Sequence, residues 1–420
     1  MIKKQKEAVT VKGKPPISRR QFISGVSAAA LSFSIIKPQL VRSSQANSKI
    51  LLGLIGCGAR GAWLADLFQK HGGYEIAAGA DYFEERVNKF GEKFNLPKNR
   101  LFTALSGYRQ LLDGKVDAVA IETPPYFHPE QAAAAVEAAA HVYLAKPIAV
   151  DVPGCHSIEN SGKKATEKNL CFLVDFQTRA DEFYQEAVRR VHEGAIGEIV
   201  FGEASYHAGF PFGQMVESLA AEPTNPENRL KAWGLDRALS GDIITEQNIH
   251  TIDVLNWIME QPPQQAFGNG GRKFLSHAGN IWDHFTVLFQ YAPDVGVTFS
   301  SRQSNGYGTS EGIKNRMFGT KAVLETEYGG QVLIRGPQES FYRGGATTGI
   351  YTDGVVANIA TFYDNITGQK FNNETVKASV QSNLITILGR TAAYENRVVT
   401  WGEIINSKEK LQADLRGLKT

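Results

Sequence analysis

A glycine-rich segment between a β-type run and a helical run constrains this chain more than any other feature. The segment Gly56-Cys57-Gly58-Ala59-Arg60-Gly61 follows the apolar run 50–55 and opens a helical pattern over 61–71. In a G-x-G-x-x-G turn, the first glycine permits the turn, the second lets the backbone approach a pyrophosphate, and the third lets helix and strand pack closely. The N–H groups at the helix start also favour phosphate oxygens. The segment therefore predicts a dinucleotide site.

An acidic residue ends the next β-type run, 74–80. Asp81 lies about twenty residues beyond the last glycine, at the spacing expected for an acid that binds ribose hydroxyls. Its carboxylate would repel a 2′-phosphate, so we expect NAD rather than NADP. The expected cofactor contacts are Gly56, Gly58, Ala59, Arg60, Gly61 and Asp81.

The hydrophobic pattern changes between the two halves of the chain. Residues 49–150 alternate short β-type runs with helical stretches, which is typical of a parallel sheet with helical crossovers. Runs 198–207, 283–291, 295–301 and 323–328 instead alternate with period two, and a helix is expected over 243–259. We predict an α/β protein: a Rossmann domain at 47–175 and a C-terminal α/β domain at 176–420 with a largely antiparallel sheet, open on one face.

Residues 1–46 form a segment of different character. They hold nine of the 45 Lys and Arg residues and one of the 43 acids. The run Ser18-Arg19-Arg20-Gln21-Phe22-Ile23, the apolar stretch 22–36 and Ser44-Gln45-Ala46 together resemble a twin-arginine export signal. A basic amphipathic helix or a membrane-spanning helix is the alternative, but a polar-interrupted apolar run of about 15 residues is too short for a stable span. We expect cleavage after about Ala46 and a periplasmic or other extracytoplasmic mature protein without a membrane span.

Charge and cysteine content exclude other classes. Without residues 1–46, acids outnumber bases, so no nucleic-acid partner is expected. Cys57, Cys155 and Cys171 have no spacing that suits a disulfide framework or a zinc site. We therefore expect no metal.

Three further motifs, in order, resemble the Gfo/Idh/MocA oxidoreductases, the family of glucose-fructose oxidoreductase and inositol dehydrogenase. The first is Thr123-Pro124-Pro125-Tyr126-Phe127-His128, similar to the loop that borders the nicotinamide in that family. The second is Ala145-Lys146-Pro147, similar to the family's Glu-Lys-Pro signature. The third is Ser240-Gly241-Asp242 followed by Glu246-Gln247-Asn248-Ile249-His250-Thr251-Ile252-Asp253, which resembles its acid-x-x-x-His-x-x-Asp element.

The resemblance implies catalytic roles for Lys146, Glu246 and His250. On one continuous helix Glu246, His250 and Asp253 would share a face. A histidine can take the proton of a hydroxyl whose carbon gives up hydride, and a carboxylate one turn away can orient it. Lys146, at the carboxyl end of a parallel strand, would polarise the reacting oxygen. A solvated helical stripe and a surface lysine are the alternatives.

Two departures from the family pattern affect these roles. The signature's glutamate is Ala145 here, so what that carboxylate contributes must come from elsewhere. Glu246 replaces the more usual aspartate and reaches one methylene farther. Thr123, Pro124, His128 and Lys146 are added to the expected cofactor contacts, although His128 is equally compatible with capping the helix that follows it.

The expected substrate pocket is less well defined. Gln177, Arg179, Tyr206, His207 and Asp253 are the candidates, with core packing as the alternative for each. An arginine there would bind a carboxylate or several hydroxyls.

The function expected is oxidation of a sugar, polyol or glycoside hydroxyl. Free nicotinamide cofactor is scarce outside the cytoplasm, so we expect a tightly held NAD that is recycled internally. One alternative is a glycosidase or lyase that oxidises a sugar carbon transiently, as relatives of this family do. A non-catalytic sugar-binding relative is the second alternative, with Ala145 as its argument. The family resemblance also implies a homo-oligomer, a dimer or a tetramer.

Overall fold

The computed structural model describes residues 49–307 and 312–420. Residues Lys49–Thr420 form one compact unit. The predicted export segment, residues 1–46, lies outside the described residues. Among the residues described, no helix is long and apolar enough to cross a membrane.

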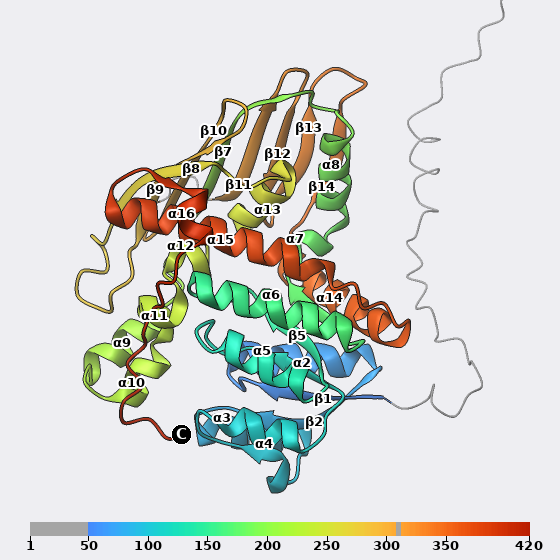
Figure 1. Ribbon diagram of the computed structural model, residues 1–420, viewed down its shortest axis with the longest axis vertical. Helices are drawn as coiled ribbons and strands as arrows, with labels where there is room; N and C mark the ends of the chain where they lie inside the picture. Colours follow the sequence, from blue (N-terminus) through green and yellow to red (C-terminus); the bar gives the residue numbers. More distant parts are fainter. Residues whose placement is uncertain (1–48, 308–311) are drawn as a thin grey trace, which may run out of the picture. The chain divides into compact units, whose positions relative to one another are not determined.

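The first half of this unit is built on a six-stranded parallel sheet (Figure 1). Its strands, in sheet order, are β3 (Leu101–Phe102), β2 (Tyr74–Ala80), β1 (Ile50–Ile55), β4 (Ala118–Ile121), β5 (His141–Ala145) and β6 (Phe172–Asp175). The connecting helices are α2 (Ala59–His71), α3 (Glu84–Phe94), η1 (Lys98–Arg100), α4 (Gly107–Asp113), α5 (His128–Glu137) and α6 (Val152–Glu167). The central strands are apolar throughout because helices bury both of their faces. This arrangement confirms the predicted Rossmann fold.

The second half carries a nine-stranded sheet. Its order is β14 (Tyr342–Ala346), β13 (Gln331–Arg335), β12 (Val323–Glu327), β11 (Gly312–Gly319), β7 (Ile199–Ala208), β10 (Val295–Gln303), β9 (His284–Tyr291), β8 (Gln265–Gly271) and β15 (Val399–Thr400). Its neighbouring strands pair antiparallel, except that β7 and β10 run parallel. The predicted, largely antiparallel C-terminal sheet is therefore confirmed.

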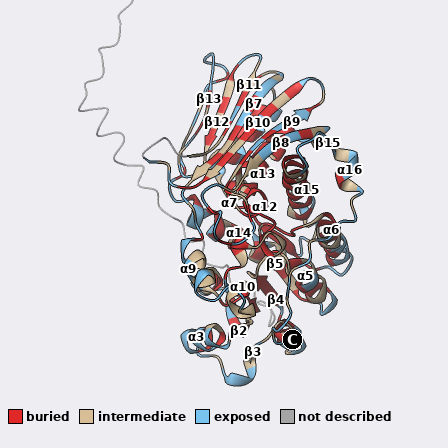
Figure 2. Ribbon diagram, turned by 90° about the vertical axis from the view of Figure 1, so that its left-hand side faces the viewer, coloured by how far each residue is buried: buried red, intermediate tan, exposed pale blue. Residues whose placement is uncertain are grey.

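Helices cover one face of this sheet and also reach back to the Rossmann half (Figures 1 and 2). The helices of the second half are α7 (Gln177–Ala180), α8 (Glu182–His192), α9 (Gly213–Ala221), α10 (Pro226–Lys231), η2 (Trp233–Leu235), α11 (Arg237–Ser240), α12 (Ile243–Glu246), α13 (Ile249–Met259), α14 (Ile350–Thr367), α15 (Glu374–Glu395) and α16 (Trp401–Ile405). Phe362 of α14 packs against Phe68 and Tyr74 of the Rossmann half. Burying each such ring contributes roughly 1.5–3 kcal/mol. The two halves therefore share a core.

The other face of the nine-stranded sheet is open. Alternate residues of β7 are exposed there, and Glu203 of this strand pairs with Arg316 at 3.1 Å. Phe201 stacks on Phe318 with ring centroids 4.3 Å apart, and Leu288 is exposed on β9. This face thus combines a charged ladder with apolar side chains.

The helix predicted over 243–259 is two helices in the structure. α12 ends at Glu246 and α13 begins at Ile249, because Gln247 and Asn248 both donate their backbone N–H to the Ile243 carbonyl. The prediction of one continuous helix that carries both Glu246 and His250 was therefore wrong. The polar run 246–248 is the local signal for this break.

Residues 407–420 run along the surface from the second half to the edge of the Rossmann half (Figure 1). Asp414 pairs with Arg229 of α10 at 2.8 Å. The Lys419 carbonyl accepts from Leu105 N at 3.1 Å, and Lys419 N donates to the Tyr82 hydroxyl at 3.3 Å. We call this segment the strap.

Deleting residues 412–420 is expected to loosen α10 and the loop after β3, because both lose their bonds to the strap. Hydrogen exchange should become faster at Leu105 and in α10. The buried helix α15 is the internal control and should keep its protection. Unchanged exchange at Leu105 and in α10 would contradict the role of the strap.

Candidate functional site

A cavity of about 630 Å³ lies at the carboxyl ends of the parallel strands. This is where open α/β sheets bind ligands. Its walls combine the glycine turn, the ends of β2, β4 and β5, and the segment from α9 to α12. The polar lining side chains include Arg60, Asp81, Arg86, Glu122, Thr123, Gln131, Lys146, Gln214, Lys231 and Glu246.

Two of the three glycines are required by the turn itself. Gly56 has φ 101°, and a Cβ there would lie 2.7 Å from the Glu122 carbonyl. A Cβ on Gly61 would lie 2.0 Å from the Gly56 carbonyl oxygen. Gly58 has φ −67° and meets only the end of Arg86, at 3.8 Å. The space at Gly58 is therefore open towards the cavity, as a pyrophosphate beside the α2 N-terminus requires.

Asp81, the residue predicted to bind the ribose hydroxyls, also lines the cavity. Its carboxylate accepts hydrogen bonds from Cys57 N at 2.8 Å and Phe83 N at 2.9 Å. Burial raises its pKa, while these bonds and nearby Arg86 act in the opposite direction. The carboxylate is thus fixed beside the glycine turn, and the residues present fit a dinucleotide.

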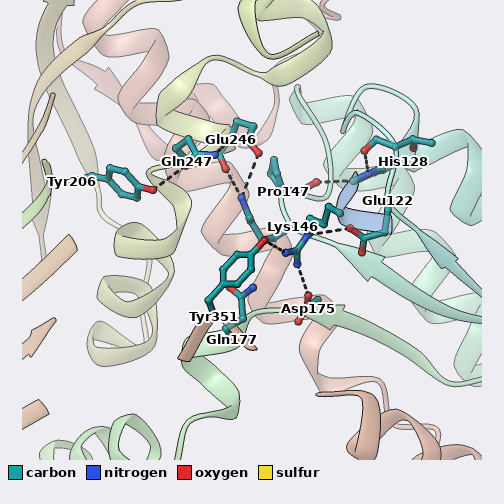
Figure 3. Close-up of polar contacts among 12 residues, drawn as sticks. Glu122, His128, Lys146, Pro147, Asp175, Gln177, Tyr206, Glu246, Gln247 and Tyr351 are labelled. Carbon is teal, nitrogen blue, oxygen red and sulfur yellow. Dashed lines mark hydrogen bonds and ion pairs between the residues drawn. The ribbon is translucent and has the colours of Figure 1, made fainter. Parts of the chain in front are cut away.

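His128 lies behind the cavity wall. The ring is 1% exposed, with Nδ1 at 2.8 Å from the Pro147 carbonyl and Nε2 at 2.7 Å from the Thr123 carbonyl. It therefore ties the loop of Thr123 and Pro124 to the Lys146-Pro147 turn (Figure 3). Thr123 and Pro124 line the cavity as expected, and His128 supports them from behind.

Lys146 is held at the inner end of the cavity. Its Nζ donates to the Glu246 carbonyl oxygen at 2.7 Å and lies 3.4 Å from Glu246 Oε1 (Figure 3). The two side chains are 11% and 9% exposed. Burial lowers the pKa of Lys146, and Glu246 opposes that shift. The structure thus brings Lys146 and Glu246 together across 100 residues of sequence.

The expected support of His250 by Glu246 is not what the structure contains. The Glu246 carboxylate contacts Lys146 and accepts from Gln247, because the helix breaks after it. The His250 ring lies against Tyr328, with centroids 5.4 Å apart. Among the described residues, its buried Nδ1 has no hydrogen-bond partner. Burial lowers the pKa of His250 well below its usual range, and the charges of Lys146 and Arg60 lower it further.

Asp253 and Arg179 form an internal ion pair. Asp253 is fully buried, and its carboxylate accepts from Arg179 Nε at 2.8 Å, from Arg179 Nη2 at 2.9 Å and from Ser382. The Arg179 guanidinium also lies over the Trp257 ring. We expected both residues to bind substrate, but their polar groups are paired with each other. The ion pair links α7, which carries Arg179, to α13, which carries Asp253.

The other substrate candidates differ in where they lie. The Tyr206 hydroxyl bonds Gln247 Oε1 at 2.9 Å, on the helix-covered face of the sheet and near Glu246 (Figure 3). His207, the next residue of β7, points to the open face and contacts Ser300 there at 3.0 Å. Gln177 is buried and accepts from the Tyr328 hydroxyl at 3.4 Å, which connects it to the surroundings of His250. Tyr206 and Gln177 therefore lie near the predicted catalytic residues Glu246 and His250, and His207 does not.

A charged cluster beside the cavity was missed. Arg60, predicted as a cofactor contact, lines the cavity, but its guanidinium pairs with Glu122 at 3.1 Å and Asp175 at 3.0 Å. It also donates to the Tyr351 hydroxyl at 2.9 Å. The available signal was that Glu122 and Asp175 each end a β-type run of a parallel sheet.

The fold and the cavity define a dinucleotide-binding α/β protein, and comparison with known proteins gives its family. Residues 50–176 match a model of the oxidoreductase family with an NAD-binding Rossmann fold. Residues 184–325 match the GFO/IDH/MocA C-terminal domain. The chain belongs to the Gfo/Idh/MocA family, which confirms the resemblance seen in its motifs.

Individual relatives are more distant. A glycosyl hydrolase family 109 protein of Shewanella sp. is 26% identical over 215 residues, which are 45% of this chain and 46% of the relative. The chain thus spans about half the length of that relative. Myo-inositol 2-dehydrogenase of Thermotoga maritima is 23% identical over 75% of this chain and 87% of its own. An NAD⁺ complex of an inositol dehydrogenase homolog from Azotobacter vinelandii matches with TM-score 0.67 and 16% identity, over 84% of this chain and 98% of the other.

Gly58→Ala is expected to weaken dinucleotide binding at least tenfold without loss of stability. The fold has room for the methyl group at φ −67°, but the group occupies the space that a pyrophosphate needs. Calorimetric titration with NAD and a thermal melt measure the two effects. Gly209→Ala, at a position with no atom within 4 Å, is the matched control. Normal NAD affinity of the Gly58 variant would contradict the site.

Lys146→Met is expected to raise the pKa of His250, because it removes one of the two positive charges that disfavour the imidazolium. The pKa should stay below the ordinary histidine value, since burial is the larger cause. NMR titration of ¹⁵N-labelled histidines measures the change. Lys314→Met is the matched control: it acts on His207 across the open face and should leave the His250 signal unmoved.

Proposed function

We propose that the chain is an NAD-dependent oxidoreductase that acts on a hydroxyl group of a sugar, polyol or glycoside. The observation that carries the proposal is the single cavity that joins the glycine turn and Asp81 to the buried Lys146–Glu246 pair. A dinucleotide held by the first group places its reactive end towards the second. NAD is preferred over NADP because Asp81 is fixed where a 2′-phosphate would be repelled.

In this proposal the residues of the chain have two roles: one accepts the proton of the substrate hydroxyl, and another stabilises the negative charge that develops on its oxygen. Burial and the charges of Lys146 and Arg60 lower the pKa of His250 and so favour its neutral form, which is the form that can accept a hydroxyl proton. The Lys146 ammonium, held by Glu246, stabilises the oxygen that loses this proton. NAD, when bound, supplies the acceptor for the hydride that leaves the same carbon.

We further propose export by the twin-arginine route and a cofactor that stays bound from one turnover to the next. The segment 1–46 supports export, and the scarcity of free NAD outside the cytoplasm supports retention. We also propose that copies of the chain associate through the open face of the nine-stranded sheet. Phe201, Phe267 and Leu288 support this, since each is more than 40% exposed on that face.

A second candidate function is cleavage of a glycosidic bond with no net redox change. Its specific support is the similarity to glycosyl hydrolase family 109 proteins, which covers 45% of this chain. Transient oxidation of a sugar carbon acidifies the neighbouring C–H, which allows elimination of the leaving group. The same residues, His250 and Lys146, serve both reactions.

One experiment separates the two candidates. The mature protein is purified without added nucleotide, the nucleotide released on denaturation is identified, and sugars and glycosides are added to native protein while reduced-nicotinamide absorbance is followed. If one sugar reduces the bound NAD and another sugar reoxidises it, the result supports the oxidoreductase. Glycoside cleavage with no net absorbance change supports the second candidate. Protein that neither carries nor binds NAD would contradict both.

His250→Asn is expected to reduce turnover by at least a hundredfold while NAD stays bound, because the proton acceptor is lost and the dinucleotide wall is intact. The released nucleotide and the rate of absorbance change are measured on the same sample. His207→Asn, on the open face, is the matched control and should keep its turnover. Near-normal turnover of the His250 variant would remove it from the mechanism.

A further inference from the structure

Two carboxylates flank Ala145 at the carboxyl edge of the parallel sheet. Ala145 of β5 pairs with Asp175 of β6 in the strand register. On its other side Ile121 of β4 pairs with Leu144, so Glu122, the next residue, lies beside Ala145. Glu122 N also extends the pairing of β4 with β1 by donating to the Ile55 carbonyl at 2.8 Å. Three adjacent strands therefore end in an acid, an alanine and an acid.

Arg60 joins the two acids. Its Nε lies 3.1 Å from Glu122 Oε2, and its Nη2 lies 3.0 Å from Asp175 Oδ2. Since β5 separates the strands that carry these acids, the guanidinium bridges the two acids across the end of β5. Glu122 and Asp175 are both labelled in Figure 3, where dashed lines mark these ion pairs. The family signature has a glutamate where this chain has Ala145. In this chain the strands on either side of β5 supply the carboxylates, those of Glu122 and Asp175.

The two acids are not equivalent. Asp175 has both oxygens engaged, because Asn358 donates to Oδ1 at 2.8 Å. Glu122 uses only Oε2, and its buried Oε1 has no hydrogen-bond partner among the described residues. The Glu122 side chain is 1% exposed, and the residue lines the cavity. Burial and the negative charge of Asp175 raise the pKa of Glu122 to about 7, although Arg60 acts in the opposite direction.

We propose that Glu122 Oε1 accepts a hydrogen bond from the carboxamide N–H₂ of the nicotinamide, and that Arg60 holds the carboxylate in place for this bond. Glu122 and Arg60 are positioning residues: they fix the orientation of the ring and take no part in proton transfer. The inference rests on the proposed function, since it requires a nicotinamide dinucleotide in the cavity.

The carboxamide is chosen as the donor because of where Glu122 lies along the cavity. The Glu122 backbone touches the glycine turn at Gly56, and the strand beside it leads into Lys146. Glu122 therefore lies between the pyrophosphate position and the catalytic lysine, on the nicotinamide half. The pyrophosphate offers only acceptors, and the adenosine ribose lies towards Asp81. On this half the dinucleotide has two kinds of donor, the hydroxyls of the nicotinamide ribose and the N–H₂ of the carboxamide. ADP-ribose keeps the ribose hydroxyls and lacks the carboxamide, so the comparison of ligands below separates the two donors.

The test compares three ligands by calorimetric titration of nucleotide-free protein: NAD, its 3-acetylpyridine analogue and ADP-ribose. The analogue replaces the carboxamide N–H₂ by a methyl group, and ADP-ribose lacks the whole ring. Wild-type protein is expected to bind NAD at least tenfold more tightly than the analogue, because a hydrogen bond to a carboxylate is lost. Equal affinities in the wild-type protein would overturn the proposal without any variant.

Glu122→Gln is the matching protein change. Arg60 retains the amide oxygen of the new side chain as its acceptor, so the amide N–H₂ faces the cavity and presents a donor to the carboxamide. The preference for NAD over the analogue should disappear, while the affinity for ADP-ribose stays within about twofold of wild type. Asp175→Asn is the control, because its carboxylate is fully partnered, and this variant should keep the preference for NAD.

The outcomes are distinct. Loss of the preference in the Glu122 variant alone supports the inference. A preference that survives in this variant, or an equal loss of affinity for all three ligands, would assign Glu122 a structural role and overturn it. A wild-type protein that binds none of the three would overturn the proposed function itself.

Discussion

The ion pairs of Arg60 hold together the part of the molecule on which every other feature of the site depends. The Arg60 side chain is 32% exposed, whereas Glu122 and Asp175 are almost completely buried. Two carboxylates in such a position repel each other and lose their hydration, so they need a shared cation. Removing one partner of a buried pair typically costs about 3–5 kcal/mol. Arg60 belongs to the glycine turn, so the same interaction fixes the dinucleotide wall to the ends of β4 and β6.

A second set of charged contacts, between Lys146, Glu246 and their neighbours, lies deeper in the cavity. Lys146 is drawn to Glu246, and the positive charges of Lys146 and Arg60 both disfavour protonation of His250. Glu122, Asp175 and Glu246 are each paired with a cation, and these cations favour the neutral form of His250.

The sequence predicted the parts of this site that depend on local pattern. The glycine turn, Asp81, Lys146 and the two-sheet α/β architecture follow from motifs and periodicity within short windows. The missed features depend on long-range contacts. Glu122 and Asp175 meet Arg60 only because the sheet brings the ends of β1, β4 and β6 to the same edge. The ion pair of Arg179 was missed because its partner Asp253 lies 74 residues away in the sequence. The break after Glu246 also altered the expected geometry, since two backbone bonds to one carbonyl override helical spacing.

The ion pairs of the strap and of Arg60 differ in their response to ionic strength. Its pair Arg229–Asp414 is about one-third exposed on both sides, so dissolved ions screen it. The acids around Arg60 are dry and are screened far less. Any opening beside Tyr82 and Leu105 has to break bonds to the strap. Salt is therefore expected to loosen the strap at α10, while the buried ion pairs of Arg60 keep most of their strength.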